Sequence, residues 1–166
     1  MMRADVVPPA VARRFGIATA AAALAVDQGT KHLALFALSP GEALPITPFF
    51  NLRLSFNEGV SFGLFADWFA GRPLVLAALT LVMTMFLVWL LFRASSRWEA
   101  AAIGMIIGGG LGNIMDRVGR SAVVDFLDLH AIGHHWPTFN LADVAIVLGA
   151  AMICVVALLA PATSKP

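Results

Sequence analysis

Two aspartates occupy apolar surroundings in which a carboxylate is seldom kept without a role. Asp125 lies between Val124 and Phe126, and Asp143 follows an Asn-Leu-Ala run at the start of a long apolar segment. A charged group in or near hydrocarbon is costly unless it has a partner. Two carboxyls held close together can share one proton and activate a water for hydrolysis. We therefore predict that Asp125 and Asp143 form a catalytic pair.

The expected chemistry divides this pair into a base and an acid. The ionised member takes a proton from a water that attacks a carbonyl, and the protonated member donates to the carbonyl oxygen and then helps the amine to leave. Asp143 falls near the start of a predicted helix, where the dipole favours its ionised form and hence the role of base. A structural interpretation stays open, in which Asn140 caps that helix and Asp143 only complements its dipole.

Other polar side chains at the ends of apolar segments are candidates to support the pair. They are Asp27, Lys31, Asn57, Asn113, Asp116, Arg117 and Asn140. Asp27 and Lys31 are four residues apart with the acid first, the favourable order for a salt bridge on one helix face, and that bridge is the leading interpretation. The 113–117 segment fits a structural network and a catalytic role equally well. Asn57 is typical of a turn, and it is also placed to bind a substrate carbonyl.

Metal and nucleophile chemistries fit the sequence less well. His130, His134 and His135 have no standard ligand spacing and no cysteine beside them, so we expect no metal site and no cofactor. The single cysteine, Cys154, lies within an apolar run, which excludes a disulfide framework. A formal net charge of +1 without a basic cluster gives no reason to expect nucleic-acid binding.

The composition is that of an integral membrane protein. Of the 166 residues, 60% are hydrophobic and 13% are charged, and the mean hydropathy is +0.85. We expect a single membrane domain over 1–166. Its four transmembrane helices are expected at about 15–38, 74–92, 98–115 and 140–160.

The first of these spans is the least regular. The apolar run at 15–26 is too short for a hydrocarbon core of about 30 Å, so the helix must continue through Asp27 and Lys31. An alternative is a cleaved signal peptide, because the Ala-rich run at 21–25 resembles the end of one.

Four spans would place both termini on one side of the membrane. The short connection between the second and third spans carries Arg93 and Arg97, so we expect that side to be cytoplasmic. The two longer connections, at about 39–73 and 116–139, then lie outside the cytoplasm.

The first outer connection contains two recognisable patterns. Leu52, Leu54 and Phe56 alternate with polar residues, which predicts a half-buried strand. The aromatic segment at 64–69 predicts a short interfacial helix. The predicted fold class is therefore an all-α membrane protein with a small β element.

Five short motifs occur in an order that resembles a known family. They are Asp27-Gln28-x-Thr30-Lys31, Asn57-x-Gly59-x-x-Phe62, Gly109-Gly110-Leu111-Gly112-Asn113-x-x-Asp116-Arg117, Val124-Asp125-Phe126 and Phe139-Asn140-x-Ala142-Asp143. Each motif alone is weak, but together they extend from the first span to the fourth. On these motifs the chain resembles the signal peptidase II family, the bacterial lipoprotein signal peptidases. One departure is Gly110, where the family pattern favours alanine; a change this small is expected to loosen helix packing without altering the chemistry.

The resemblance implies an aspartyl endopeptidase of the bacterial inner membrane. Such enzymes have four transmembrane helices, an extracytoplasmic β-cradle and a short periplasmic helix, and they remove signal peptides from prolipoproteins by cleaving before a diacylglyceryl-modified cysteine. The family's catalytic pair falls on Asp125 and Asp143, and its supporting or substrate-binding positions fall on the seven polar residues named above. The resemblance also implies no metal or organic cofactor, contact with membrane lipid, inhibition by globomycin, cytoplasmic termini and an extracytoplasmic active site; we expect a monomer.

Two other classes of function compete with the peptidase. A small proton-coupled transporter or channel would use the aspartates as a relay, but it should place carboxylates near the membrane midplane rather than at span ends. A non-enzymatic membrane scaffold would use the polar motifs only to hold helices together.

Overall fold

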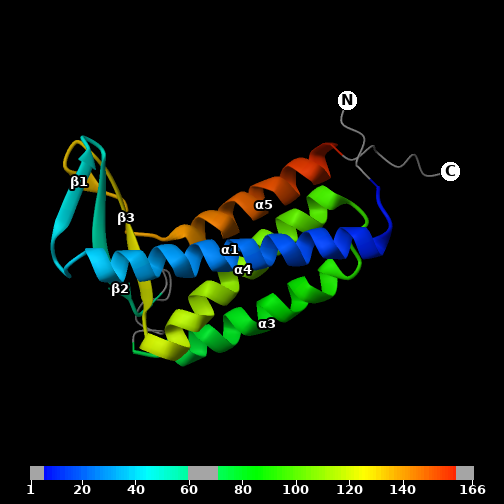
Figure 1. Cartoon of the computed structure of the whole chain (residues 1–166), viewed down its shortest axis with the longest axis horizontal. Helices are drawn as coiled ribbons and strands as arrows, with labels where there is room; N and C mark the ends of the chain where they lie inside the picture. Colours follow the sequence, from blue (N-terminus) through cyan, green and yellow to red (C-terminus); the bar gives the residue numbers. More distant parts are fainter. Residues whose placement is uncertain (1–5, 60–70, 160–166) are drawn as a thin grey trace.

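The structure, a computed structural model, describes residues 6–59 and 71–159. In this part of the chain long helices lie along one another, and a small sheet extends beyond one end of them (Figure 1). The helices are α1 (Pro9–Ala37), α3 (Pro73–Leu91), α4 (Arg97–Arg120) and α5 (Leu141–Leu159). The strands are β1 (Ala43–Thr47), β2 (Phe50–Asn57), β3 (Val123–Ala131) and β4 (His134–His135).

The helix starts follow from their local sequences. Pro9 and Pro73 stand in the first turns of α1 and α3, where a missing backbone N–H costs no helical hydrogen bond. The side chain of Ser96 caps α4 by accepting a hydrogen bond from the Trp98 amide at 3.2 Å. At its other end α4 stops at Ser121, whose φ of 60° is in the left-handed region.

Three of the described helices are long and apolar enough to cross a membrane. They are α1, α3 and α5, whose most apolar windows have mean hydropathies of 1.2, 2.6 and 2.6. The glycine-rich and charge-ended α4 is not among them, so the predicted span at 98–115 stays a prediction. Two helices extend beyond the predicted spans: α1 begins at Pro9, before residue 15, and α4 ends at Arg120, after residue 115. Both extensions carry charged residues, which a search for apolar runs leaves out.

The central helix is α4, which packs against α1, α3 and α5. A Cβ atom on Gly104 would overlap the Gly16 carbonyl of α1, and one on Gly108 would overlap the Ala20 carbonyl. This pair of glycines, four residues apart, therefore lets the backbones of α1 and α4 approach closely. A buried apolar cluster joins α1, α3 and α4 at the end away from the sheet; its members are Ala12, Leu91, Ala94, Ala100, Ile103 and Ile107.

The sheet is antiparallel and has the order β1-β2-β3-β4. The predicted strand is confirmed as β2, but a bulge between Leu52 and Ser55 interrupts the alternation and leaves Phe56 46% exposed. Pro45 lies on the edge strand β1, where it removes no hydrogen bond from an inner ladder. The predicted interfacial helix at 64–69 lies outside the described residues.

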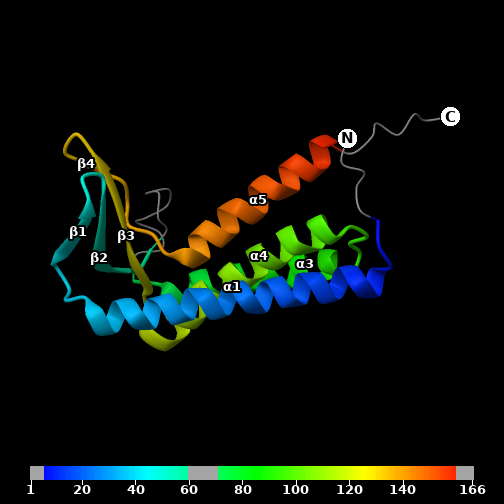
Figure 2. The same ribbon diagram turned by 45° about the horizontal axis from the view of Figure 1, so that its top comes forward.

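The connection from β3 to α5 determines where the polar residues meet. Figure 2 shows β3 rising from the end of α4 across the sheet, after which the chain returns to the start of α5. The returning segment is held to β3 at Phe139, whose carbonyl accepts hydrogen bonds from the Phe126 and Leu127 amides at 3.0 and 2.9 Å. The first turn of α5 therefore lies beside the first half of β3.

Candidate active site

Asp125 lies on β3 with its carboxyl group turned into the protein. Its side chain is 1% exposed. The side-chain amide of Asn140 donates to one carboxyl oxygen at 2.6 Å, and that of Asn57 donates to the other at 3.2 Å. The carboxyl group is therefore shielded from free solvent and bound by two amide groups.

Asp143 lies in the first turn of α5 and forms a reciprocal cap with Asn140. The Asp143 amide donates to the Asn140 side-chain oxygen at 3.0 Å, and the Asn140 amide donates to an Asp143 carboxyl oxygen at 3.3 Å. The capping interpretation of Asn140 is therefore correct. The same Asn140 side chain also binds Asp125, so the cap joins the two aspartates.

A second asparagine completes the connection between the carboxyl groups. Asn113 of α4 donates through Nδ2 to Asp143 at 2.9 Å. Its Oδ1 atom accepts from Asn140 Nδ2 at 3.3 Å and from Lys31 Nζ at 3.0 Å. The two donors to Asn113 Oδ1 fix the orientation of its amide, with the NH₂ group directed at Asp143.

The two aspartates are coupled electrostatically. Burial and the negative charge of Asp143 raise the pKa of Asp125 from its ordinary 3.8 to about 7, although hydrogen bonds from Asn140 and Asn57 act in the opposite direction. Near neutral pH the pair therefore holds a proton on Asp125 for much of the time. This is the protonation state that acid–base hydrolysis by two carboxyls requires.

Lys31 lies beneath this site as a buried cation between two buried acids. Its Nζ atom is 2.9 Å from Asp27 and 2.8 Å from Asp116, and all three side chains are at most 1% exposed. The predicted Asp27–Lys31 salt bridge is confirmed, whereas the contact of Lys31 with Asp116 was not predicted. Buried ions of this kind need complete hydrogen bonding to be tolerated.

The two acids of this network bind the elements that carry the aspartate pair. Asp27 accepts a hydrogen bond from the Ala142 amide, in the first turn of α5, at 2.9 Å. Asp116 accepts one from the Val124 amide of β3 at 3.2 Å. The network is therefore structural, and what it fixes is the relative position of the two segments that hold Asp125 and Asp143.

Arg117 and Asn57 meet at the loop that follows β2. Asn57 Oδ1 accepts from the Gly59 amide at 3.0 Å, so the predicted turn is confirmed. Arg117 donates to the Gly59 carbonyl at 3.4 Å, while its Nε atom is buried without a hydrogen-bond partner among the described residues. Within the described part of the chain Arg117 thus holds this loop against α4, close to both aspartates.

A second acid of β3 is also buried. Asp128 follows Asp125 by three residues and is 1% exposed. It accepts hydrogen bonds from Asn51 at 3.1 Å and from His135 Nδ1 at 2.8 Å. Both partners come from other strands, and so the spacing within β3 carries no signal for them.

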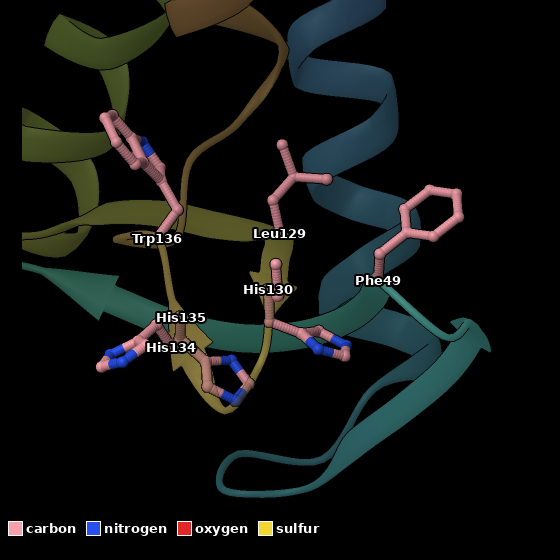
Figure 3. A pocket seen from close by; sticks show the side chains of 7 residues that line it. Phe49, Leu129, His130, His134, His135 and Trp136 are labelled. Carbon is pink, nitrogen blue, oxygen red and sulfur yellow. The ribbon is translucent and has the colours of Figure 1, made fainter.

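The three histidines of this region line an open pocket of about 370 Å³ at the far end of the sheet, together with Phe49, Leu129, Ala131 and Trp136 (Figure 3). His130 and His135 stack with ring centroids 4.9 Å apart. Among the described residues, no three His, Cys, Asp or Glu side chains are arranged to hold a metal ion.

The fold and the site together define an integral membrane protein with two linked carboxyls at one end of its helices. Residues 19–159 match the model of the signal peptidase (SPase) II family. The lipoprotein signal peptidase of Polynucleobacter necessarius is 41% identical over 138 residues, which cover 82% of this chain and 85% of that protein. That of Thermodesulfovibrio yellowstonii is 43% identical over 126 residues, 76% of this chain and 82% of that protein.

Solved structures agree with these sequence matches. A bacterial membrane enzyme solved by the in meso method at 2.3 Å resolution has a TM-score of 0.78 and 25% identity, covering 99% of this chain and 97% of the other. The chain belongs to the signal peptidase II family. It is an aspartic-type peptidase that removes signal peptides from lipoprotein precursors, and the transporter alternative finds no support.

Proposed function

We propose that Asp125 and Asp143 are the catalytic pair of this peptidase and act on one water molecule. The observation that carries the assignment is the chain of hydrogen bonds from Asp125 through Asn140 and Asn113 to Asp143. This chain directs two carboxyls from different elements toward a common space. In the described part of the protein, Asp143 is also the acid whose charge raises the pKa of Asp125.

The environments of the two carboxyls assign their roles. Asp143 lies in the first turn of α5, where the helix dipole favours a negative charge, and is the base that takes a proton from water. Asp125, with its pKa near 7, is the acid that donates toward the carbonyl oxygen. The water oxygen bonds to the scissile carbonyl carbon, the C–N bond breaks, and the amine leaves with a proton from the pair.

The remaining polar residues support this step. Asn140 and Asn113 orient the two carboxyls, and Asn57 and Arg117 orient the substrate backbone or stabilise charge in the transition state. Lys31, with Asp27 and Asp116, keeps α5 and β3 in place. No part of this scheme uses a metal ion or an organic cofactor.

The substrate is a prolipoprotein whose cysteine carries a diacylglyceryl group, cut at the peptide bond before that cysteine. The acyl chains favour the hydrocarbon by about 0.8 kcal/mol for each buried CH₂, and so hold the scissile bond at headgroup depth. Both aspartates lie where the helices meet the sheet, which suits a bond presented at that depth (Figure 1).

The membrane arrangement that fits this substrate has α4 as a fourth span and one domain over 1–166. The β-sheet forms a cradle outside the cytoplasm, and both termini lie inside. The start of α1, the end of α3, the start of α4 and the end of α5 all lie away from the sheet, which supports this arrangement (Figure 1). We further propose a monomer in contact with bilayer lipid in the bacterial inner membrane, inhibited by globomycin.

The direct test is cleavage of a lipidated prolipoprotein by purified Asp125→Asn and Asp143→Asn variants. Each should remain folded in detergent and lose about 10²–10⁴-fold or more in kcat, because the pair loses its base or its acid. Glu42→Gln, which alters an exposed acid before β1, is the matched control and should cleave normally. Near-normal turnover by either aspartate variant would remove that residue from the mechanism.

A further inference from the structure

Asp128 joins three strands of the sheet through one carboxylate. It belongs to β3, its Asn51 partner belongs to β2, and its His135 partner belongs to β4. Burial favours the neutral form, but the hydrogen bonds of His135 and Asn51 and the charges of His135 and His130 outweigh it and lower the pKa of Asp128. The group is therefore an ionised acceptor at neutral pH, suited to hold two donors.

The contact with β2 repeats the contact that Asp125 makes. Asn57 donates to Asp125 and Asn51 donates to Asp128, so two Asn–Asp pairs connect the same two strands. A bulge in β2 lies between them, where the register shifts between Leu52 and Ser55. A slip of one residue would turn every side chain of β3 to the opposite face. The outer pair therefore protects the register on which the inner pair depends.

The contact of Asp128 with His135 of β4 connects β3 to the segment that leads to Asn140. From His135 the chain continues through Trp136, whose amide donates to the Leu129 carbonyl at 2.8 Å, to Asn140. His135 thus ties β4 to β3 five residues before Asn140, whose side chain binds Asp125 and caps α5. Figure 3 shows His135 on β4 beside the β3 residue His130, on which its ring stacks.

We propose that Asp128 is a positioning residue for the peptidase reaction, because its carboxylate holds β2 and β4 to β3 and thereby sets Asp125 relative to Asn140. It lies roughly 10 Å along the strand from Asp125, at about 3.3 Å per residue, and so acts through the backbone rather than on substrate. The inference rests on the proposed role of Asp125 and Asp143.

The test compares purified Asp128→Ala, Asp128→Asn and His135→Ala enzymes with wild type on a lipidated prolipoprotein. Asp128→Ala leaves buried Asn51 without its acceptor, and we expect kcat to fall about 10–100-fold with little change in KM. The pH profile of kcat should also move, because the Asn57 and Asn140 contacts that tune Asp125 are displaced. Asp128→Asn keeps an acceptor oxygen for only one of the two donors, so its loss of kcat should be smaller than that of Asp128→Ala.

Controls separate positioning from simple loss of folded protein. Glu42→Ala removes an exposed acid near the sheet and should leave both kcat and the pH profile unchanged. His135 is 47% exposed, so His135→Ala should fold even if Asp128→Ala does not, and should show the same shift in pH profile with a smaller loss of kcat.

Two results would overturn the proposal. One is a wild-type kcat and pH profile in folded Asp128→Ala. If Asp128→Ala does not fold, the same result in His135→Ala would overturn the proposal. The other is a loss of rate that matches the loss of folded enzyme while the pH profile stays fixed. Inactive Asp125→Asn and Asp143→Asn enzymes in the same assay would show that the catalytic assignment survives such a failure.

Discussion

The side-chain amide of Asn140 donates a 2.6 Å hydrogen bond to Asp125 while its oxygen accepts from the backbone amide of Asp143. One residue therefore caps α5, binds a strand and joins the two carboxyls. An N-cap needs only the oxygen of the side chain. The NH₂ group remains available, and here it fixes the carboxyl that carries the raised pKa.

Replacing Asn140 should shift the pH profile of cleavage upward. The Asn140 hydrogen bond lowers the pKa of Asp125, so Asn140→Ala should raise that pKa above its present value of about 7. We expect a loss of about 10²-fold in kcat as well, because Asn140 positions both carboxyls. The measurement is kcat against pH. Asn57→Ala should move the profile in the same direction by less, and a downward shift in either variant would contradict the electrostatic account.

The raised pKa of Asp125 also predicts how stability depends on pH. The unfolded carboxyl titrates near 3.8 and the folded one near 7. This group's stabilising contribution is therefore present below about pH 4 and is lost as the pH rises through 7, with an upper limit of about 4 kcal/mol. Asp125→Asn should gain stability relative to wild type between pH 4 and pH 8, as measured by thermal unfolding in detergent. A difference in Tm that is the same at both pH values would argue against the raised pKa.

Removing the buried Lys31 cation should destabilise the fold beneath the aspartate pair. Lys31→Met removes the cation between buried Asp27 and Asp116 and leaves Asp116 with its longer 3.4 Å contact with Arg120, which should cost about 3–5 kcal/mol. Arg53→Met removes an exposed cation from β2 and should change stability by less than about 0.5 kcal/mol. Chemical unfolding in mixed micelles would compare them. Equal stability of the two variants would mean that the network contributes nothing.

Two neighbouring glycines of α4 should respond differently to alanine. A Cβ on Gly112 would overlap the Asp27 carboxylate, so Gly112→Ala should displace Asp27 from Lys31 and abolish cleavage. A Cβ on Gly110 would lie 3.1 Å from the Thr84 hydroxyl, a contact that a small shift relieves. Gly110→Ala should stay within about 1 kcal/mol of wild type, because better helix propensity offsets the crowding. Comparable losses of Tm in both variants would show that the overlap with Asp27 makes Gly112 no more sensitive to alanine than Gly110.

The features that the sequence predicts are those in which the interacting residues are close along the chain. The Asp27–Lys31 bridge is one helix turn, and Asn140 and Asp143 are one cap. The contact between Lys31 and Asp116 was not predicted. Asp116 reaches Lys31 only because glycines permit the close approach of α1 and α4.

The sheet illustrates the same limit. The alternation in β2 was visible, but its pairing with β3 depends on a bulge that no local pattern encodes. Asp128 is buried against side chains of two other strands, and no pattern within its own segment predicts those partners. Whether an acid of β3 faces water is therefore determined by how β3 pairs with β2 and β4, and not by the residue type alone.

The measurement that tests the account most directly is an experimental structure with a non-cleavable lipidated peptide bound. We expect a carboxyl oxygen of Asp125 and one of Asp143 to lie within about 2.6–3.2 Å of the same water or of the scissile carbonyl group. Carboxyls more than about 8 Å apart, with no shared water between them, would contradict a common hydrolytic site, because one bridging water cannot span that gap.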